Sequence, residues 1–517
     1  MSPLYPKWDR YGGVFPERGQ DKTMSTTVQS AEFDHRQRAF VGRMRGRGLE
    51  ALESGTIVVI PSISFDESEL RKIVGINHYE ERMLFVLLWL RNPDLSVVYV
   101  SSERIDEAIV DYYLSFLEQP EEARKRLVLL HLDDPRPCAL SAKLLEHETF
   151  LDELRGEVES REDAYILTFN VSPWERAISE RIQTPLYGPS PEAAALGSKS
   201  GSRRVAREAN VPLLPGHEDL FSVTEVEAAI GHLRKEVPGL KTVVLKLNNG
   251  FSGQGNAVIE MADVRSPLPA STTVFCAEEE RWSSYSSKVA AEGAIVEQLA
   301  RHHQLVSPSV QLRVIPGGQV EVVSTHDQIL GGPDDQVYLG CRFPARADYR
   351  KVIMEHGLAV AEVLASVGVI GSFGIDFVGW PDGDGYVLHL GEINLRMGGT
   401  THPFLMARMV TGGRLDEATG ELMAGGRPKY YVASDNLKSP TYRCLTPERA
   451  VSVLQSKGIA FNQSSGTGAT LHLLGALQRF GKLGTVCISN SPEEAADLYD
   501  QVIATLDEEA GQLSGRN

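Results

Sequence analysis

Short apolar runs alternate with amphipathic helical patterns through the first third of the chain. Strands are expected at 56–63, 96–102, 126–132 and 163–169, with helices at 79–90 and 105–117. Strands that are apolar throughout and are separated by helices are typical of a parallel sheet covered on both faces. The pattern therefore predicts a doubly wound α/β sheet. No G-x-G-x-x-G follows the first strand, so a dinucleotide site is not expected there.

The rest of the chain shows a different pattern of helices and strands. Residues 173–426 mix helices with antiparallel strands, and GGRP at 425–428 is interpreted as a linker. The C-terminal segment predicts a second α/β unit: helices at 447–457 and near 471–480, a strand at 484–489 and a closing helix from Pro492. The predicted division is a mobile tail (1–47), an N-terminal α/β domain (48–175), a central α+β domain (176–426) and a small α/β C-terminal domain (427–517).

Charge and composition narrow the functional classes. The 517 residues carry 52 Lys+Arg against 69 Asp+Glu, a net charge of −17, and 42% are hydrophobic. This balance argues against general nucleic-acid or anionic-membrane binding. Basic residues between Arg36 and Arg47 are interpreted as the solvated face of a helix, since no aromatic residues interleave with them.

The cysteines and the apolar runs indicate the cellular compartment of the protein. The five cysteines are widely spaced, with no zinc or redox motif, and are expected to be reduced. The longest apolar run, 83–90, is too short to span a bilayer, and no apolar signal segment precedes the first strand. A cytoplasmic protein is expected.

The segment 373–396 carries the strongest chemical signal. PDGDG separates two apolar stretches, which predicts a β-hairpin, and Asp376 and Glu392 lie eight residues on either side of Asp384. The two carboxylates are therefore expected opposite each other on paired strands, where like charges repel unless a cation is shared.

The second strand of this hairpin adds two more polar groups. Its two-residue period places Glu392, Asn394 and Arg396 on one face. Asp376, Glu392 and Asn394 are oxygen ligands of the kind that Mg²⁺ prefers, and Arg396 can hold a phosphoryl oxygen. The alternative is a hairpin whose polar face is simply solvated. The convergence of four polar groups on one face makes this alternative less favoured.

Three further segments are weak signals taken singly. Lys246 ends a strand that leads into a glycine-rich loop, where backbone N–H groups can approach phosphates; the chain has no Walker A motif. Lys199 precedes a helix, and the strand 293–300 ends in Glu297, whose surroundings can offer backbone groups to an adenine edge and a carboxylate to a ribose. The predicted nucleotide-binding residues are Lys199, Lys246, Gly250, Ser252, Gly253, Gly255, Glu297, Gln298 and Leu299.

In this order and spacing the elements resemble the ATP-grasp superfamily, with GID at 374–376 and E-I-N-x-R at 392–396 as the specific pieces. Longer stretches at 75–102, 324–345, 392–404 and 481–499 are similar to the pheganomycin-type ATP-grasp peptide ligases. The resemblance implies an ATP-grasp fold behind a pre-ATP-grasp domain, with ATP held between two α+β subdomains and Mg²⁺ at Asp376, Glu392 and Asn394.

The implied reaction is ATP-dependent amide formation through an acyl phosphate, in natural-product biosynthesis. The partners would be a small or nonproteinogenic carboxylate and a peptide or amino-acid amine, and a homodimer is one expectation for the assembly. Arg396, and with less support Arg313 and His402, are the predicted catalytic residues; Gln311, His326, Asp327 and Arg342 are further polar candidates for the acyl substrate. Two alternatives stay open: a carboxylate–amine ligase of amino-acid metabolism, and a non-catalytic ATP-binding module.

Overall fold

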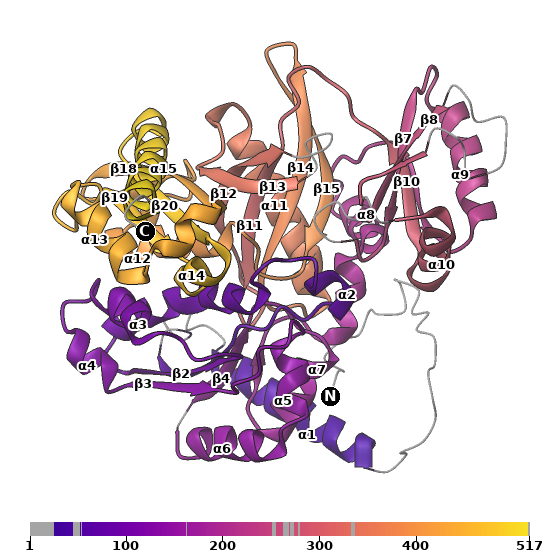
Figure 1. The fold of residues 1–517 in the computed structure, drawn as a ribbon. Helices are drawn as coiled ribbons and strands as arrows, with labels where there is room; N and C mark the ends of the chain where they lie inside the picture. Colours follow the sequence, from indigo (N-terminus) through magenta and orange to yellow (C-terminus); the bar gives the residue numbers. More distant parts are fainter. Residues whose placement is uncertain are drawn as a thin grey trace.

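The computed structural model describes residues 25–44, 52, 54–161, 163–250, 255–261, 268, 273–277, 280–331 and 337–514. These residues form three β-sheets (Figure 1). Along the chain these are the N-terminal sheet, a small antiparallel sheet, and a large sheet whose strands come from several segments. Among the described residues, no helix is both long and apolar enough to cross a membrane.

The N-terminal sheet has the strand order β3-β2-β1-β4-β5, and all of its pairs are parallel. Its strands are β1 (Gly55–Ile60), β2 (Leu95–Ser101), β3 (Leu127–His131), β4 (Ala164–Thr168) and β5 (Leu186–Tyr187). Its helices are α2 (Glu67–Leu70), η3 (Ile76–Arg91), α3 (Glu107–Leu114), α4 (Pro120–Arg124), α5 (Leu140–Leu145), α6 (Glu148–Glu159) and α7 (Pro173–Arg181). Separate apolar cores lie on the two faces of the sheet. The predicted doubly wound sheet is confirmed.

One helix lies where a mobile tail was expected. Helix α1 (Ser25–Met44) buries Phe33, Phe40 and Met44, which share one helical face. The side chain of Gln37 exchanges hydrogen bonds with the backbone of Leu186 in β5, at 2.9 and 2.7 Å. The tail prediction is therefore wrong for residues 25–44, because a few well-spaced apolar residues suffice to dock a helix that is otherwise polar.

The small antiparallel sheet projects from the body of the molecule (Figure 1). Its order is β6-β10-β7-β8-β9, with β6 (Gly216–Leu220), β7 (Thr242–Leu247), β8 (Asn256–Glu260), β9 (Thr273–Phe275) and β10 (Ala294–Gln298). Helices α9 (Val223–Glu236) and α10 (Trp282–Glu292) pack on it around a core of its own. Helices η4 (Pro191–Gly197) and α8 (Lys199–Glu208) join this subdomain to the rest of the chain.

The large sheet runs β15-β14-β11-β12-β13-β18-β17-β16, with β20 beside β18 and β19 beside β20. Its first strands are β11 (Pro308–Val314), β12 (Val320–Gly331), β13 (Val337–Phe343), β14 (Gly371–Asp382) and β15 (Gly385–Asn394). Helix α11 (Ala347–Ser366) packs against β11 and β12, and α12 (Thr401–Thr411) follows β15.

The C-terminal segment extends this large sheet. Its elements are β16 (Arg414–Leu415), β17 (Leu422–Ala424), β18 (Arg427–Lys438), η7 (Pro440–Cys444), α13 (Pro447–Ser456), β19 (Gly468–His472), η8 (Leu474–Ala476), α14 (Leu477–Phe480), β20 (Lys482–Ser489) and α15 (Pro492–Ser514). Strand β18 pairs with both β13 and β20, so hydrogen bonds cross the boundary expected at 426.

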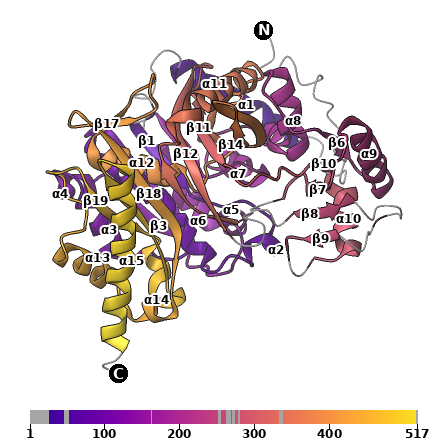
Figure 2. The ribbon, with the colours of Figure 1, turned by 90° about the horizontal axis from the view of Figure 1, so that it is seen from above.

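Two local predictions in this segment are wrong. GGRP is the turn of the β17–β18 hairpin rather than a linker, with Gly425 and Gly426 at φ +59° and +75°. A helix was expected near 471–480, but Leu471 and His472 belong to strand β19, which pairs with β20. The α-helix in this range, α14, begins only at Leu477. The core of this segment is continuous with one face of the N-terminal sheet, and Figure 2 shows α15 along that side of the molecule.

Candidate active site

The β14–β15 hairpin brings two carboxylates face to face. Asp376 pairs with Glu392, as the sequence predicted. The turn is centred between Gly383 and Asp384 rather than on Asp384, because Asp382 pairs with Gly385. An irregularity next to Asp376 inserts one extra residue in β15 and restores the predicted opposition.

Hydrogen-bond donors separate the two carboxylates. The Asn394 side-chain amide donates to Asp376 Oδ2 at 2.9 Å and to Glu392 Oε1 at 3.2 Å. Gln328 Nε2, on β12, donates to Asp376 Oδ1 at 2.7 Å, and Lys199 Nζ forms an ion pair with Glu392. Burial raises the pKa of Asp376, although the Arg396 and Lys199 charges oppose this. The Asn394 amide, which contacts both carboxylates, stands where a cation that they share would bind.

Arg396 lies beyond the end of β15, on the side of the N-terminal domain. Its Nη2 donates to Asn394 Oδ1 at 2.9 Å, and its guanidinium lies 5.6 and 6.0 Å from the ring centres of Phe65 and Phe169. Burial lowers the pKa of Arg396 to about 10, so it stays charged near neutrality. The Met397 N–H donates to the Phe169 carbonyl at 2.9 Å, which ties this loop to the N-terminal sheet.

Lys199 opens helix α8 and reaches both subdomains. Ser198 caps the helix, its hydroxyl accepting from the Gly201 N–H at 3.0 Å. The Lys199 N–H donates to the Asn248 carbonyl at 3.1 Å, and its Nζ to the Gly250 carbonyl at 3.4 Å. Burial, followed by the nearby Lys246 charge, lowers the pKa of Lys199 to about 7. A polyanion placed here would favour the charged amine.

Glu297 occupies a different role from the one predicted. Its carboxylate is 3% exposed and pairs with Lys246 Nζ at 2.6 Å and with Arg203 Nη1 at 3.0 Å. Both of its oxygens therefore already hold a cation, which does not favour the ribose contact expected from the sequence. The pair instead positions Lys246 beside the glycine-rich loop.

The predicted adenine-edge contacts are also engaged elsewhere. The N–H groups of Gln298 and Leu299 donate to the carbonyls of Pro215 and Thr242, at 2.9 and 3.2 Å. These two donors are thus used within the small subdomain, and the structure does not favour them as free adenine-binding groups.

The glycine-rich loop closes on itself at its base. A Cβ added at Gly255 would lie 2.8 Å from the Gly250 Cα, so the two backbones approach more closely than side chains allow. Ser252 and Gly253, also predicted to bind nucleotide, lie outside the described residues.

Arg313 and His402 do not touch the carboxylate cluster in any hydrogen bond of the described residues. Arg313, on β11, forms an ion pair with Glu321 at 3.1 Å. The Nε2 of His402 lies 2.9 Å from His472 Nε2 and 3.3 Å from Asp435 Oδ1, in a buried cluster. His402 therefore contacts the C-terminal segment, and its expected catalytic role is not supported.

Two of the other polar candidates, His326 and Asp327, have structural partners. His326 Nε2 lies 2.6 Å from the Tyr431 hydroxyl, and Asp327 accepts from the Tyr349 hydroxyl at 2.6 Å. Sequence reasoning missed Gln328 and Arg203, which contact Asp376 and Glu297. For Gln328 a signal existed, because it shares one face of its strand with Ser324 and His326. For Arg203 none did, since its partner is distant in sequence.

The site thus has two opposed carboxylates and an amide on the large sheet, with a guanidinium just beyond its last strand. Lys199 reaches it from helix α8, and Lys246 and the glycine-rich loop belong to the small sheet. This arrangement defines an ATP-grasp ligase. The IQCH-like ATP-grasp family model matches residues 191–274 and 268–418, and the PGM1 C-terminal domain model matches residues 449–502. The chain belongs to the ATP-grasp family, among the pheganomycin-type ligases, and is a carboxylate–amine ligase.

Relatives support this assignment. The L-propargylglycine–L-glutamate ligase of Streptantibioticus cattleyicolor is 32% identical over 463 residues, which cover 87% of this chain and 94% of that protein. IQ motif-containing protein H of Danio rerio is 21% identical over 423 residues, covering 71% of this chain and 40% of that protein.

Solved structures share the fold at low sequence identity. A biotin carboxylase–β-γ-ATP complex from Campylobacter jejuni has a TM-score of 0.53 at 15% identity and covers 90% of this chain and 96% of that one. An ADP complex of an N5-carboxyaminoimidazole ribonucleotide synthetase has a TM-score of 0.51 at 13% identity, covering 88% and 98%. The predicted ATP-grasp fold is confirmed.

Proposed function

We propose that this protein uses ATP and Mg²⁺ to form an amide bond between a small or nonproteinogenic carboxylate and the amine of an amino acid or peptide. The observation that carries this is the convergence of Asp376, Glu392, Asn394 and Arg396 with Lys199 at one end of the hairpin. A free carboxylate resists attack by an amine because it is negatively charged. Conversion to an acyl phosphate provides a good leaving group.

The donor set fits a magnesium ion. Asp376 and Glu392 are opposed carboxylates whose hydrogen-bond and ion-pair partners, among the described residues, are Asn394, Gln328 and Lys199. One or two carboxylates are a common protein share of an Mg²⁺ shell completed by phosphates and water. Asn394 would add its amide oxygen once its side chain turns over, because its nitrogen faces the carboxylates and its oxygen accepts from Arg396. When bound, Mg²⁺ would neutralise charge on the β- and γ-phosphates.

The remaining residues would position the reacting groups. Lys199 and Lys246 would contact the α- and β-phosphates, and Glu297 would hold Lys246 in place through its 2.6 Å ion pair. Arg396 would orient the acyl carboxylate and stabilise charge as the amine attacks. The aromatic rings of Phe65 and Phe169 lie beside its guanidinium, at 5.6 and 6.0 Å, and would help to hold it in position.

The relative's name suggests the first substrates to test. That protein joins L-propargylglycine and L-glutamate. We therefore infer that an acidic amino acid and a small nonproteinogenic amino acid are the class of substrates here. An assay would supply both with MgATP and follow ADP release together with the mass of the amide product.

Glu392→Ala tests the assignment. We expect turnover to fall by about a thousandfold or more, because a cation ligand and the Lys199 partner are lost together. Circular dichroism and the melting temperature should show a folded protein, and Glu362→Ala on the exposed side of α11 serves as the matched control. Full activity in Glu392→Ala would refute the magnesium site. ATP binding without carboxylate-dependent ADP release, with any acid supplied, would favour a non-catalytic binding module.

A further inference from the structure

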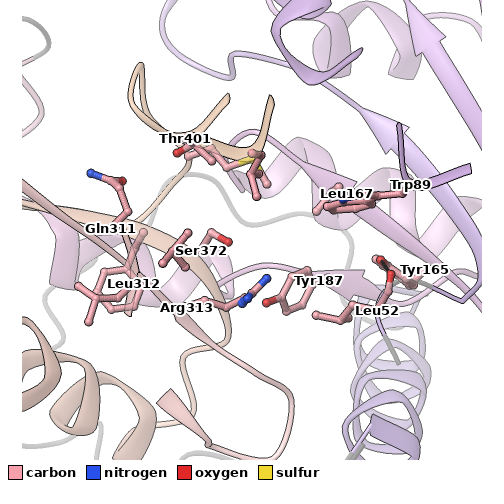
Figure 3. Close-up of a pocket in the computed structure, with 14 residues that line it drawn as sticks. Leu52, Trp89, Tyr165, Leu167, Tyr187, Gln311, Leu312, Arg313, Ser372 and Thr401 are labelled. Atoms are coloured by element: carbon pink, nitrogen blue, oxygen red, sulfur yellow. Dashed lines mark hydrogen bonds between the residues drawn. The ribbon is translucent and has the colours of Figure 1, made fainter. Parts of the chain in front are cut away.

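A small cavity lies between the N-terminal sheet and the large sheet, beside the loop that follows Arg396. Figure 3 shows it between the ribbons of the two domains, with Arg313 pointing toward Tyr187. Its free space is about 30 Å³, room for roughly two waters or one carboxylate group. Its walls are mostly apolar and include Trp89, Tyr165, Leu167, Met397 and Leu405.

Three buried polar atoms of this cavity have no hydrogen-bond partner among the residues that the structure describes. They are Trp89 Nε1, the Tyr187 hydroxyl and Arg313 Nε, on side chains of residues that are 9%, 5% and 9% exposed. Buried polar groups in native proteins are nearly always paired, so three exceptions around one cavity call for an explanation. The indole and guanidinium groups can only donate, which points to a ligand that accepts hydrogen bonds.

The charge at the cavity favours an anionic group. Arg313 carries a positive charge in a mostly apolar wall, and Glu321 engages only its Nη2 among the described contacts. Within the described part of the chain, its Nε has no partner. A carboxylate can accept from a guanidinium edge, an indole N–H or a phenol hydroxyl, and all three kinds of donor line this cavity.

The cavity adjoins the reaction centre. A second, smaller cavity includes Arg396 and shares Leu167, Tyr187, Ser372 and Met397 with the first. The shared residues make the two cavities neighbours, so a small dicarboxylate can place one carboxylate in the first and the other beside Arg396.

We propose that Trp89, Tyr187 and Arg313 bind a second carboxylate of the acid substrate, the one that does not react. The substrate would then be a small dicarboxylate, such as an acidic amino acid, with an apolar stem against Leu167 and Met397. This inference rests on the proposed function, and it assigns to Arg313 a binding role at the distal end of the substrate rather than contact with the acyl phosphate.

Binding of simple probes tests this recognition directly. Glutarate and pentanoate have five-carbon chains and differ by one terminal carboxylate. With the full-length protein and a non-hydrolysable MgATP analogue, calorimetry should show glutarate binding at least tenfold more tightly than pentanoate. Equal affinities would overturn the proposal and indicate a cavity that holds water only.

Tyr187→Phe removes one of the three donors. The hydroxyl has no protein partner, so the melting temperature should not fall, while the dissociation constant of glutarate should rise about fivefold and that of pentanoate should not change. Trp89→Phe should have the same selective effect. An unchanged glutarate affinity in both variants would contradict the proposal.

A matched control separates this effect from the loss of any buried tyrosine hydroxyl. Tyr99, in β2, is fully buried and donates to the Glu80 carbonyl at 2.6 Å, away from the cavity. Tyr99→Phe should lower the melting temperature and leave the preference for glutarate intact. Failure of the ligase reaction is distinguishable, because it would appear as absent amide product with glutarate binding preserved.

Discussion

At the scale of single residues, Glu297 shows how a buried charge is held by its partners. One carboxylate, 3% exposed, bridges Lys246 of its own subdomain's sheet and Arg203 of helix α8. Removing one member of such a set leaves the others charged and desolvated, which costs more than the interaction itself contributes. The acidic residue thus serves the site by keeping Lys246 extended.

Glu297→Gln should therefore be strongly destabilising. We expect the free energy of unfolding to fall by about 3–5 kcal/mol, measured by urea denaturation. Glu260→Gln is the control, since Glu260 forms an exposed 2.9 Å pair with Arg301 and should cost less than about 1 kcal/mol. Equal effects of the two substitutions would show that burial does not govern the Glu297 pairings.

At the scale of elements, the glycine-rich connection between β7 and β8 depends on close backbone approach. The base of the loop brings Gly250 and Gly255 together, and Tyr285 of α10 donates to the Gly255 carbonyl at 2.9 Å. A side chain in this position would push the strand ends apart and move Lys246 with them. The loop geometry and the lysine position are therefore one structural unit.

Gly255→Ala is expected to disturb this unit. The added methyl would lie 2.8 Å from Gly250 Cα, so stability should fall by about 1–3 kcal/mol and the KM for ATP should rise. Gly231→Ala, within α9 and with open space at its Cβ, should be neutral or stabilise by about 0.5–1 kcal/mol. Normal ATP kinetics and stability in Gly255→Ala would refute the packing argument.

At the scale of the whole molecule, Asp435 joins three segments. Its carboxylate lies 3.3 Å from Arg82 of η3, 3.3 Å from His402 of α12 and 2.7 Å from His472 of β19. The N-terminal domain, the catalytic sheet and the C-terminal segment thus meet at one buried acid. The continuous core across these parts supports the same conclusion, that they fold as a unit.

This junction predicts an acid-labile protein. Burial lowers the pKa of His402 to about 4 and that of His326 to about 3, so both are neutral in the fold. An unfolded histidine titrates near 6.5, hence the unfolded state binds more protons below that pH. Their contribution is fully present above pH 6.5 and is lost as the pH falls toward 4.

Urea denaturation at pH 7.5 and 4.5 would measure this effect. His402 alone should account for a loss of about 2–3 kcal/mol over the interval, since one pKa unit corresponds to about 1.4 kcal/mol. His402→Gln should flatten the pH dependence. An unchanged slope in that variant would show that His402 does not titrate on unfolding.

The sequence by itself determined what depends on local periodicity. Buried strands between helices predicted the parallel sheet, and the two-residue period with the PDGDG turn predicted the hairpin. The predicted opposition of Asp376 and Glu392 is observed, but it also needs the extra residue in β15, which the pattern did not indicate. The order of the motifs predicted the family. These features survive because strand period and turn chemistry are set by neighbouring residues.

Only the tertiary structure decided which distant groups meet. It docked α1, joined the C-terminal strands to the catalytic sheet, and gave Glu297 and His402 partners that changed their expected roles. It also brought Trp89, Tyr187 and Arg313 around one cavity from three separate elements. Contacts of this kind arise from the packing of sheets and helices across the whole chain, which no local pattern encodes.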